Sequence, residues 1–294
     1  MGDLMGQLQL RAFAKVNYAL EVRGIREDGY HEISTVMQSI SLADEVSLEV
    51  AEEGFKLHVE PDEVEIGPLE SNTIYRAWKS LSEAVNQDLP VKIHLHKKIP
   101  AGAGLGGGSA DAAAVLVGLN ELFALGLSEE ESRGVGSSVG ADVPFCIAGG
   151  TALGEGVGEK LAPLTAPLDH HLLILKPNRG ADTGEIYRAH DEDPAADLPF
   201  VQPVMEALRV GDFGAFARSV GNVLSPVTKK AVPEVDEYER YLLNHGALGA
   251  AMTGTGTAVY GIFATEQAAR SAETKLRAPF IGACRPVSSG VEII

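Results

Sequence analysis

A glycine-rich segment in the middle of the chain limits what the protein can fold into more than any other feature. Residues 100–117 read PAGAGLGGGSADAAAVLV, with five glycines in the seven positions from Gly102 to Gly108. Glycine lets backbone N–H groups converge without Cβ clashes, and the run after Ser109 favours a helix. A loop that opens a helix binds anions, because the first helical N–H groups are free. We therefore expect a phosphate site here. The alternative, a purely structural turn, would need fewer glycines.

None of three known types of phosphate-binding loop accounts for this segment. GAGLGG at 102–107 matches the GxGxxG dinucleotide fingerprint, but residues 97–100 separate it from the preceding strand. The region roughly 20 positions on is helical, where the fingerprint needs an acidic residue after a strand. The mononucleotide P-loop requires a lysine after the glycines, and protein kinases require HRD and DFG motifs; this sequence has neither feature. The loop alone therefore indicates a polyphosphate at a helix N-terminus, without identifying it.

Composition restricts the partners of this site. The chain has 294 residues, 45% of them hydrophobic, and a net charge of -17. This charge argues against a nucleic-acid or anionic-membrane surface, although a few basic side chains could still converge on a small anion. The N-terminus lacks the pattern of a signal peptide, and no apolar run approaches the ~18 residues of a membrane span. Cys146 and Cys284 have no metal-ligand spacing, so we expect reduced thiols in a cytoplasmic protein.

The pattern of apolar residues predicts an α+β chain in two halves, divided near residue 160. In the first half, strands are expected within residues 8–60 and 91–100, and a strand–turn–strand over 149–161. Helices are expected after the N-caps Asn72 and Ser128, and a deeply buried helix after Ser109. In the second half, the expected elements are a strand at 170–177, a polar connection to 203, helices at 203–210, 213–223 and 232–245, a glycine turn with a strand at 247–263 and a last helix at 266–278.

Two charged residues stand out against their surroundings. Lys15 lies in the apolar strand AFAKVNYAL, where an ammonium group is costly unless it reaches a partner or solvent. Asn17 shares its face of that strand. Asp142, in GADVPF, is by position a helix N-cap with Pro144 in the first turn.

Three further patterns are open to a structural or a functional interpretation. DGYHE at 28–32 is a hairpin turn that places Tyr30 beside His31, and TGTG at 253–256 is a second glycine turn. His94 and His96 share a strand face with possible metal spacing, but no third ligand is in view, so surface positions are the simpler interpretation.

Taken together, these motifs resemble the GHMP kinase superfamily. The resemblance rests on AKVNYAL at 14–20, PAGAGLGGGSADAA at 100–113 and GAAMTGTGTAVYGIF at 249–263. Within the superfamily, REDGYHEISTVMQSISLAD, GADVPF and GEGVGE are most similar to the branch that phosphorylates the 2-hydroxyl of 4-diphosphocytidyl-2-C-methyl-D-erythritol in non-mevalonate isoprenoid synthesis. The resemblance implies an α+β fold with an ATP-binding N-terminal domain over 1–160, like domain 2 of ribosomal protein S5. It also implies a ferredoxin-like C-terminal domain over 161–294.

The resemblance also implies roles for individual residues. Asp142 would be the catalytic base, with Lys15 as its partner, and Ser109 a ligand of Mg²⁺. The substrate, a cytidine diphosphate-linked alcohol, would contact Asn17, Tyr30, His31, Tyr187, Thr253 and Gly254. ATP would bind Lys97, Pro100, Ala101, Gly102, Ala103, Gly104, Leu105, Gly106, Gly107, Gly108, Ser109 and Ala110.

Two alternatives stay open at this stage. Another GHMP kinase with a smaller alcohol, such as homoserine or mevalonate, would have no use for the Tyr30–His31 pair. A non-catalytic nucleotide-binding module would have no use for Lys15 together with Asp142.

Overall fold

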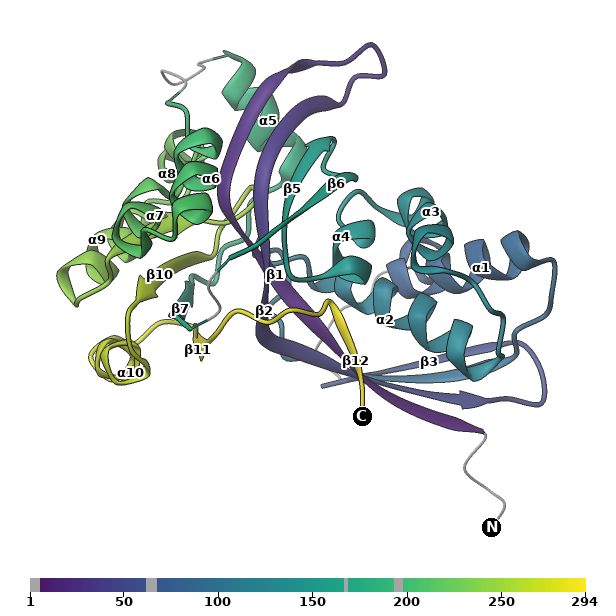
Figure 1. Ribbon diagram of the computed structural model, residues 1–294. Helices are drawn as coiled ribbons and strands as arrows, with labels where there is room; N and C mark the ends of the chain where they lie inside the picture. Colours follow the sequence, from purple (N-terminus) through teal and green to yellow (C-terminus); the bar gives the residue numbers. More distant parts are fainter. Residues whose placement is uncertain (1–5, 62–67, 167–168, 193–197) are drawn as a thin grey trace.

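A long β-hairpin runs through the whole molecule. The computed structural model describes residues 6–61, 68–166, 169–192 and 198–294. Strands β1 (Gln7–Ile25) and β2 (His31–Val50) pair antiparallel along their length, interrupted by three register shifts. One end of β2 pairs with β4 (Val91–His96) and the other with β5 (Thr151–Gly156). The hairpin therefore connects parts of the fold that would otherwise lie far apart (Figure 1).

The remaining strands of the large sheet extend this hairpin on both sides. The sheet runs in the order β12-β1-β2-β4-β3; beside this path, β8 pairs with β1, β5 pairs with β2, and β6 pairs with β5. Its outer strands are β3 (Phe55–Glu60), β6 (Lys160–Leu164), β8 (Gly221–Asn222) and β12 (Val291–Ile293). The short 3-10 helix η1 (Leu69–Ser71) and four α-helices accompany it (Figure 1), namely α1 (Thr73–Val85), α2 (Gly107–Leu122), α3 (Glu129–Val139) and α4 (Val143–Ala148).

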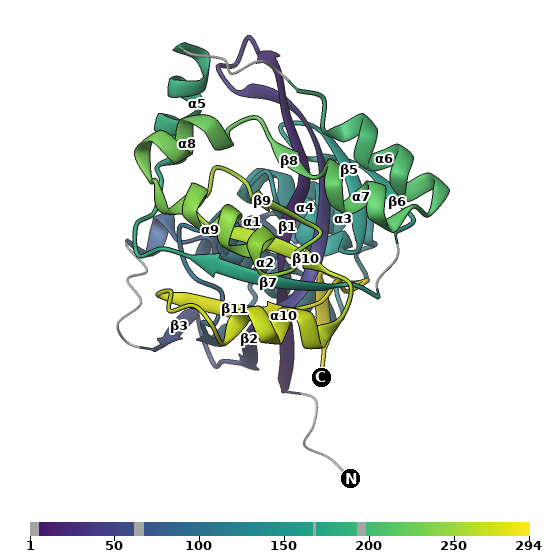
Figure 2. The same ribbon diagram turned by 90° about the vertical axis from the view of Figure 1, so that its left-hand side faces the viewer.

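A second sheet forms in the C-terminal half. Its antiparallel strands run in the order β11 (Phe280–Cys284), β7 (His171–Lys176), β10 (Val259–Phe263), β9 (Gly249–Met252). Along the chain, helices separate β7 from β9, and α10 (Glu266–Glu273) separates β10 from β11, as in ferredoxin-like folds (Figure 2). The other helices are α5 (Thr183–Glu192), α6 (Val201–Val210), α7 (Phe213–Ser219), α8 (Ser225–Ala231) and α9 (Glu234–Asn244).

The predicted α+β class is confirmed. The division at residue 160 stays a prediction, and strands from beyond it (β8 and β12) pair with β1. Both predicted N-caps of the first half are present: the Asn72 side chain accepts a bond from the Ile74 amide, and Ser128 forms a capping box with Glu131. In the part of the chain that the structure describes, no helix is long and apolar enough to cross a membrane.

The predicted polar connection between β7 and residue 203 is wrong in part. It contains α5, which the abundance of polar residues concealed, because only Ile186 and His190 of this helix are buried. Helix α8 was also missed. It has seven residues with a proline in its first turn, and its buried Val227 contributes to the core of the C-terminal half, so it depends on tertiary contacts.

Helix α2 lies deepest in the fold, as its apolar sequence predicted. All its alanines are fully buried, and it packs against β1 and β2. At Gly118 the approach is so close that an added Cβ would overlap the Leu48 side chain and lie 3.1 Å from Leu10 Cδ1. Gly134, on the exposed side of α3, has no atom within 4 Å of such a Cβ.

These two glycines form a matched pair for a stability test. Gly118→Ala is expected to lower the free energy of unfolding by about 1–3 kcal/mol, because the core must expand to take the methyl group. Gly134→Ala should raise it by up to about 1 kcal/mol, because alanine is the better helix former. Urea denaturation measures both; equal effects of the two substitutions would contradict this packing of α2.

Candidate active site

The glycine-rich loop separates two cavities. The first, of about 650 Å³, lies between the hairpin, α5 and the turn that follows β9. Its lining includes Lys15, Asn17, Tyr30, His31, Asp142, Tyr187, Arg188 and Gly254. The second, of about 430 Å³, is lined by residues 100–109 and by Val59, Ile74, Leu95, Lys97 and Asp111. Gly102, Gly104, Gly106 and Ser109 line both cavities, whereas Ala110 is fully buried in α2.

Two of the loop glycines are required by close contacts. Gly104 and Gly106 have φ values of 74° and 71°, and α2 begins directly after them. A Cβ on Gly104 would collide with the Thr253 carbonyl group, and one on Gly106 would lie 3.0 Å from Lys15 Cγ. Backbone bonds hold the loop in place, from Lys15 N to Leu105 O at 2.9 Å and from Ala258 N to Ala103 O at 3.1 Å. The loop therefore presents the N-terminus of a 16-residue helix to both cavities.

Lys15 and Asp142 meet at the edge of the first cavity. Lys15 Nζ lies 3.3 Å from Asp142 Oδ2; the lysine side chain is 5% exposed and the aspartate side chain 34%. Asp142 occupies the N-cap position of α4, but within the described structure its carboxylate makes no capping hydrogen bond. The carboxylate is turned to a cation and to the cavity instead, so the simple capping interpretation does not account for this residue.

Asn17 connects this pair to the C-terminal half. Its Oδ1 accepts bonds from Lys15 Nζ at 2.9 Å and from the Gly254 amide at 2.9 Å, and its Nδ2 donates to Thr35 Oγ1 at 2.8 Å. The Thr253 hydroxyl lies 3.1 Å from both Asn17 Oδ1 and Gly104 O. Thr253 is fully buried, whereas Gly254 lines the first cavity. The threonine thus holds the loop, and only the glycine is open to a ligand.

The Lys97 ammonium group is held by two buried aspartate side chains. Its Nζ lies 2.5 Å from Asp44 Oδ2 and 2.7 Å from Asp111 Oδ2. The other oxygen of Asp44 accepts bonds from the amides of Lys98 and Ile99, where the chain enters the loop. Burial raises the pKa of Asp111 to about 8, against the lowering effect of Lys97. Lys97 lines the second cavity, yet its charge is already engaged, which the sequence did not indicate.

An aromatic pair lies where the hairpin tip meets α5. The His31 ring stacks on Tyr187, with centroids 4.4 Å apart, and His31 Nε2 bonds to Asp191 Oδ1 at 2.9 Å. Burial, with a smaller contribution from the Asp142 carboxylate, raises the pKa of Tyr187 to about 12, so its phenol stays neutral. Tyr30 lines the same cavity but is 66% exposed.

Sequence reasoning missed several residues around this pair. Asp191 and Arg188 lie on α5, which was predicted to be an irregular connection, and Arg188 lines the first cavity. Thr183 and Thr255 line it too, and their hydroxyl oxygens are 3.1 Å apart. The only local signal for α5 within the described residues is that Ile186 and His190, four positions apart, share its buried face, and a histidine gives little apolar contrast in so polar a segment.

Family models and proteins of known function match most of the chain. The family described as GHMP kinases N terminal domain matches residues 72–150, and GHMP kinases C terminal matches residues 204–282. The 4-diphosphocytidyl-2-C-methyl-D-erythritol kinase of Caldicellulosiruptor bescii is 41% identical over 270 residues, covering 92% of this chain and 94% of the relative. The enzyme of that name from Caldanaerobacter subterraneus subsp. tengcongensis is 40% identical over 98% of this chain and all of the relative.

Solved structures of kinases are similar to this chain over nearly its whole length. A crystal structure of 4-(cytidine 5'-diphospho)-2C-methyl-D-erythritol kinase superposes with a TM-score of 0.80 at 36% identity, covering 95% of this chain and 99% of the other. A homoserine kinase from Cytophaga hutchinsonii also has a TM-score of 0.80 but only 19% identity, over 100% of this chain and 99% of the other. The second likeness concerns the fold alone.

The buried Asp44–Lys97–Asp111 cluster predicts a pH dependence of stability. A carboxyl group whose pKa is raised on folding contributes stability that is complete below about pH 4 and lost as the pH rises toward about 8. Asp111→Asn keeps a neutral acceptor beside Lys97, so it should reduce the fall in unfolding free energy between about pH 5 and about pH 8. Urea denaturation across this range, with the exposed Asp88→Asn as control, measures the effect; parallel profiles of Asp111→Asn and the unmodified chain would contradict it.

Proposed function

The chain belongs to the GHMP kinase family, and we propose that it uses ATP to phosphorylate the 2-hydroxyl of 4-diphosphocytidyl-2-C-methyl-D-erythritol. Relatives of that name match it at about 40% identity over nearly its full length. The observation that carries the proposal is the Lys15–Asp142 pair, which lies between the glycine loop and a cavity large enough for a nucleotide-linked alcohol. The proposal also includes the division of the chain into domains 1–160 and 161–294 and a cytoplasmic location.

The donor occupies the glycine loop. The ATP phosphates accept hydrogen bonds from the loop amides at the N-terminus of α2, and the base enters the second cavity, whose walls include Val59, Ile74 and Leu95. Mg²⁺ prefers oxygen ligands, and the Ser109 hydroxyl beside the loop fits it. When bound with ATP, the ion offsets charge on the phosphate oxygens. Lys97 acts on the loop through Asp44 and Asp111 rather than as a free cation.

The acceptor occupies the first cavity. The Asp142 carboxylate takes the proton of the substrate's 2-hydroxyl. The hydroxyl oxygen attacks the γ-phosphorus atom of ATP, and the bond from that phosphorus to the oxygen of ADP breaks. The Lys15 ammonium, 3.3 Å from that carboxylate, holds it in place and offers positive charge to the developing alkoxide. Asn17 fixes Lys15 in turn and faces the same cavity, where it is a further contact for the substrate.

The cytidine end of the substrate lies at the hairpin tip. Tyr187 provides an aromatic face, and Tyr30, exposed at the rim, is free to close on the other face of the base. The bond from His31 to Asp191 orients the imidazole, so that its second nitrogen is available to the edge of the base. Arg188 and Gly254 line the wall between the two ends, where the Arg188 guanidinium offers the donors that a diphosphate needs.

The direct test is ATP consumption by the purified protein with a panel of alcohols. Turnover is expected with 4-diphosphocytidyl-2-C-methyl-D-erythritol and not with homoserine or mevalonate. Phosphorus NMR of the product locates the new phosphate at the 2-position. Turnover with homoserine or mevalonate alone would assign the chain to another branch of the family, and ATP binding without turnover of any alcohol would favour a non-catalytic module.

Asp142→Asn tests the assignment of the base. Asparagine has the same shape but cannot accept the proton, so kcat should fall by roughly 10²–10⁴-fold. The dissociation constant for ATP, measured by calorimetry, should stay unchanged, because Asp142 does not contribute to the glycine loop. Near-normal turnover would remove Asp142 from this role.

Tyr187 tests the position of the cytosine. Tyr187→Ala should raise the KM of the cytidyl substrate by roughly tenfold or more, because base stacking contributes about 1–3 kcal/mol. The KM of ATP should not change. Tyr187→Phe keeps the ring and should restore the KM of the cytidyl substrate. Steady-state kinetics of both variants measure these effects. An unchanged KM of the cytidyl substrate in Tyr187→Ala would place the base elsewhere.

A further inference from the structure

Three histidines and a glutamate share one exposed face of the β3–β4 strand pair. The two strands run parallel, and their register places His58 beside His94 and Glu60 beside His96. In β4 these histidines alternate with the buried Ile93 and Leu95. The sequence showed only His94 and His96; the tertiary pairing of two strands, about 30 residues apart in the chain, supplies His58 and Glu60.

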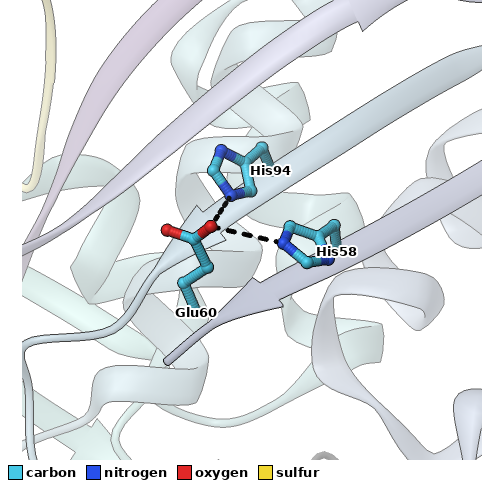
Figure 3. A group of neighbouring side chains, drawn as sticks. All are labelled: His58, Glu60 and His94. Atoms are coloured by element: carbon cyan, nitrogen blue, oxygen red, sulfur yellow. Dashed lines mark hydrogen bonds and ion pairs between the residues drawn. The ribbon is translucent and has the colours of Figure 1, made fainter. Parts of the chain in front are cut away.

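Three of these side chains, His58, Glu60 and His94, converge on a common centre. The carboxylate oxygen Glu60 Oε1 lies 3.4 Å from His58 Nε2 and 3.3 Å from His94 Nε2, as Figure 3 shows. Its other oxygen lies 3.7 Å from His96 Nδ1, and the rings of His58 and His94 stack with centroids 4.9 Å apart. One ligand atom from each of His58, Glu60 and His94 lies within 4.8 Å of the other two.

These distances fit a metal ion better than direct hydrogen bonds. A charge-assisted N–H···O bond has its heavy atoms about 2.7–2.9 Å apart, and all three contacts to Glu60 are longer. Bonds to zinc of about 2.0–2.2 Å in a tetrahedral site place the ligand atoms roughly 3.3–3.5 Å from one another. The side chains are about half exposed, so the small adjustments that bring His58 and His94 around an ion meet little resistance.

We propose that His58, Glu60 and His94 bind a divalent transition-metal ion of the zinc class. Two imidazoles with one carboxylate are a ligand set that suits zinc and its neighbours and not Mg²⁺, which prefers oxygen. Lys56 and Lys92 lie on the same face, two residues before His58 and His94 in their strands, where their charge would oppose a cation. The charge of Lys92 is paired with Glu49 at 2.9 Å. The net charge of -17 favours cations at the surface in general.

The site is separate from the proposed site of phosphoryl transfer. Val59 and Leu95, which alternate with the ligands, line the second cavity on the opposite face of the sheet. An ion bound by Glu60 and His94 would cross-link β3 and β4 at the end where the Lys97 amide donates to Glu60 O and the chain enters the glycine loop. Binding is therefore expected to stabilise this end of the sheet, independently of the proposed kinase function.

Calorimetric titration with ZnCl₂ tests the proposal. The experiment uses the full chain without an affinity tag, stripped with EDTA and exchanged into a buffer that does not bind metals. One equivalent of Zn²⁺ should bind, and an excess of Mg²⁺ should not compete. His94→Ala and His58→Ala should each weaken binding by roughly tenfold or more, because each removes a ligand. His171→Ala, on β7 and outside the cluster, is the matched control and should bind as the unmodified chain does.

Thermal unfolding gives a second measurement. Zn²⁺ should raise the Tm of the unmodified chain and of His171→Ala, and leave that of the His58→Ala/His94→Ala double variant unchanged. Both cysteines are buried in the folded chain, so they do not compete for Zn²⁺ in the titration of the native state. Absence of saturable binding by the unmodified chain, or undiminished binding by the double variant, would overturn the proposal.

Discussion

One buried amide, that of Asn17, holds the proposed active site together. Its oxygen accepts bonds from the Lys15 ammonium and the Gly254 amide, and its nitrogen donates to Thr35 on β2. A buried polar group must be satisfied in this way, because an unpaired one costs more than the bond contributes. The consequence is that a strand near the N-terminus, its hairpin partner and a turn close to the C-terminus meet at one point. The position of the lysine beside Asp142 depends on this arrangement.

The glycine loop is held from both sides. On the side of the first cavity, Gly104 touches the backbone of Thr253, at a distance that only a glycine allows. On the other side, Asp44 accepts two backbone amides at the entry to the loop, and Lys97 links it to Asp111 on α2. A loop that binds phosphate through its amides must be rigid before the ligand arrives, because otherwise part of the binding energy is lost in ordering it. Buried charges on one side and close packing on the other provide this rigidity.

The two ends of the first cavity differ in how they are built. Lys15 and Asn17 are buried on β1, and Asp142 is fixed at the N-terminus of α4, as suits groups that must meet a reacting atom with little freedom. Tyr30 and His31 sit at the tip of the long hairpin, and Tyr187 on a short polar helix beside it (Figure 1). Recognition of a base by stacking tolerates more movement than proton transfer does, and the more exposed end of the cavity has that role in the proposed function.

Several local features follow from the sequence alone: the glycine loop and the helix after it, the caps at Asn72 and Ser128, the strand with Lys15 and the hairpin turn before His31. Each follows from residues next to one another in the chain, where backbone freedom, capping and alternation act directly. The sequence could not reveal α5, since few of its residues are apolar, nor that Lys97 is paired with Asp44 and Asp111. Strand register and helix packing alone brought Asp142 to Lys15, Thr253 to Gly104 and His58 to His94, because contacts between residues far apart in the chain are decided by how the elements pack, which no local pattern records.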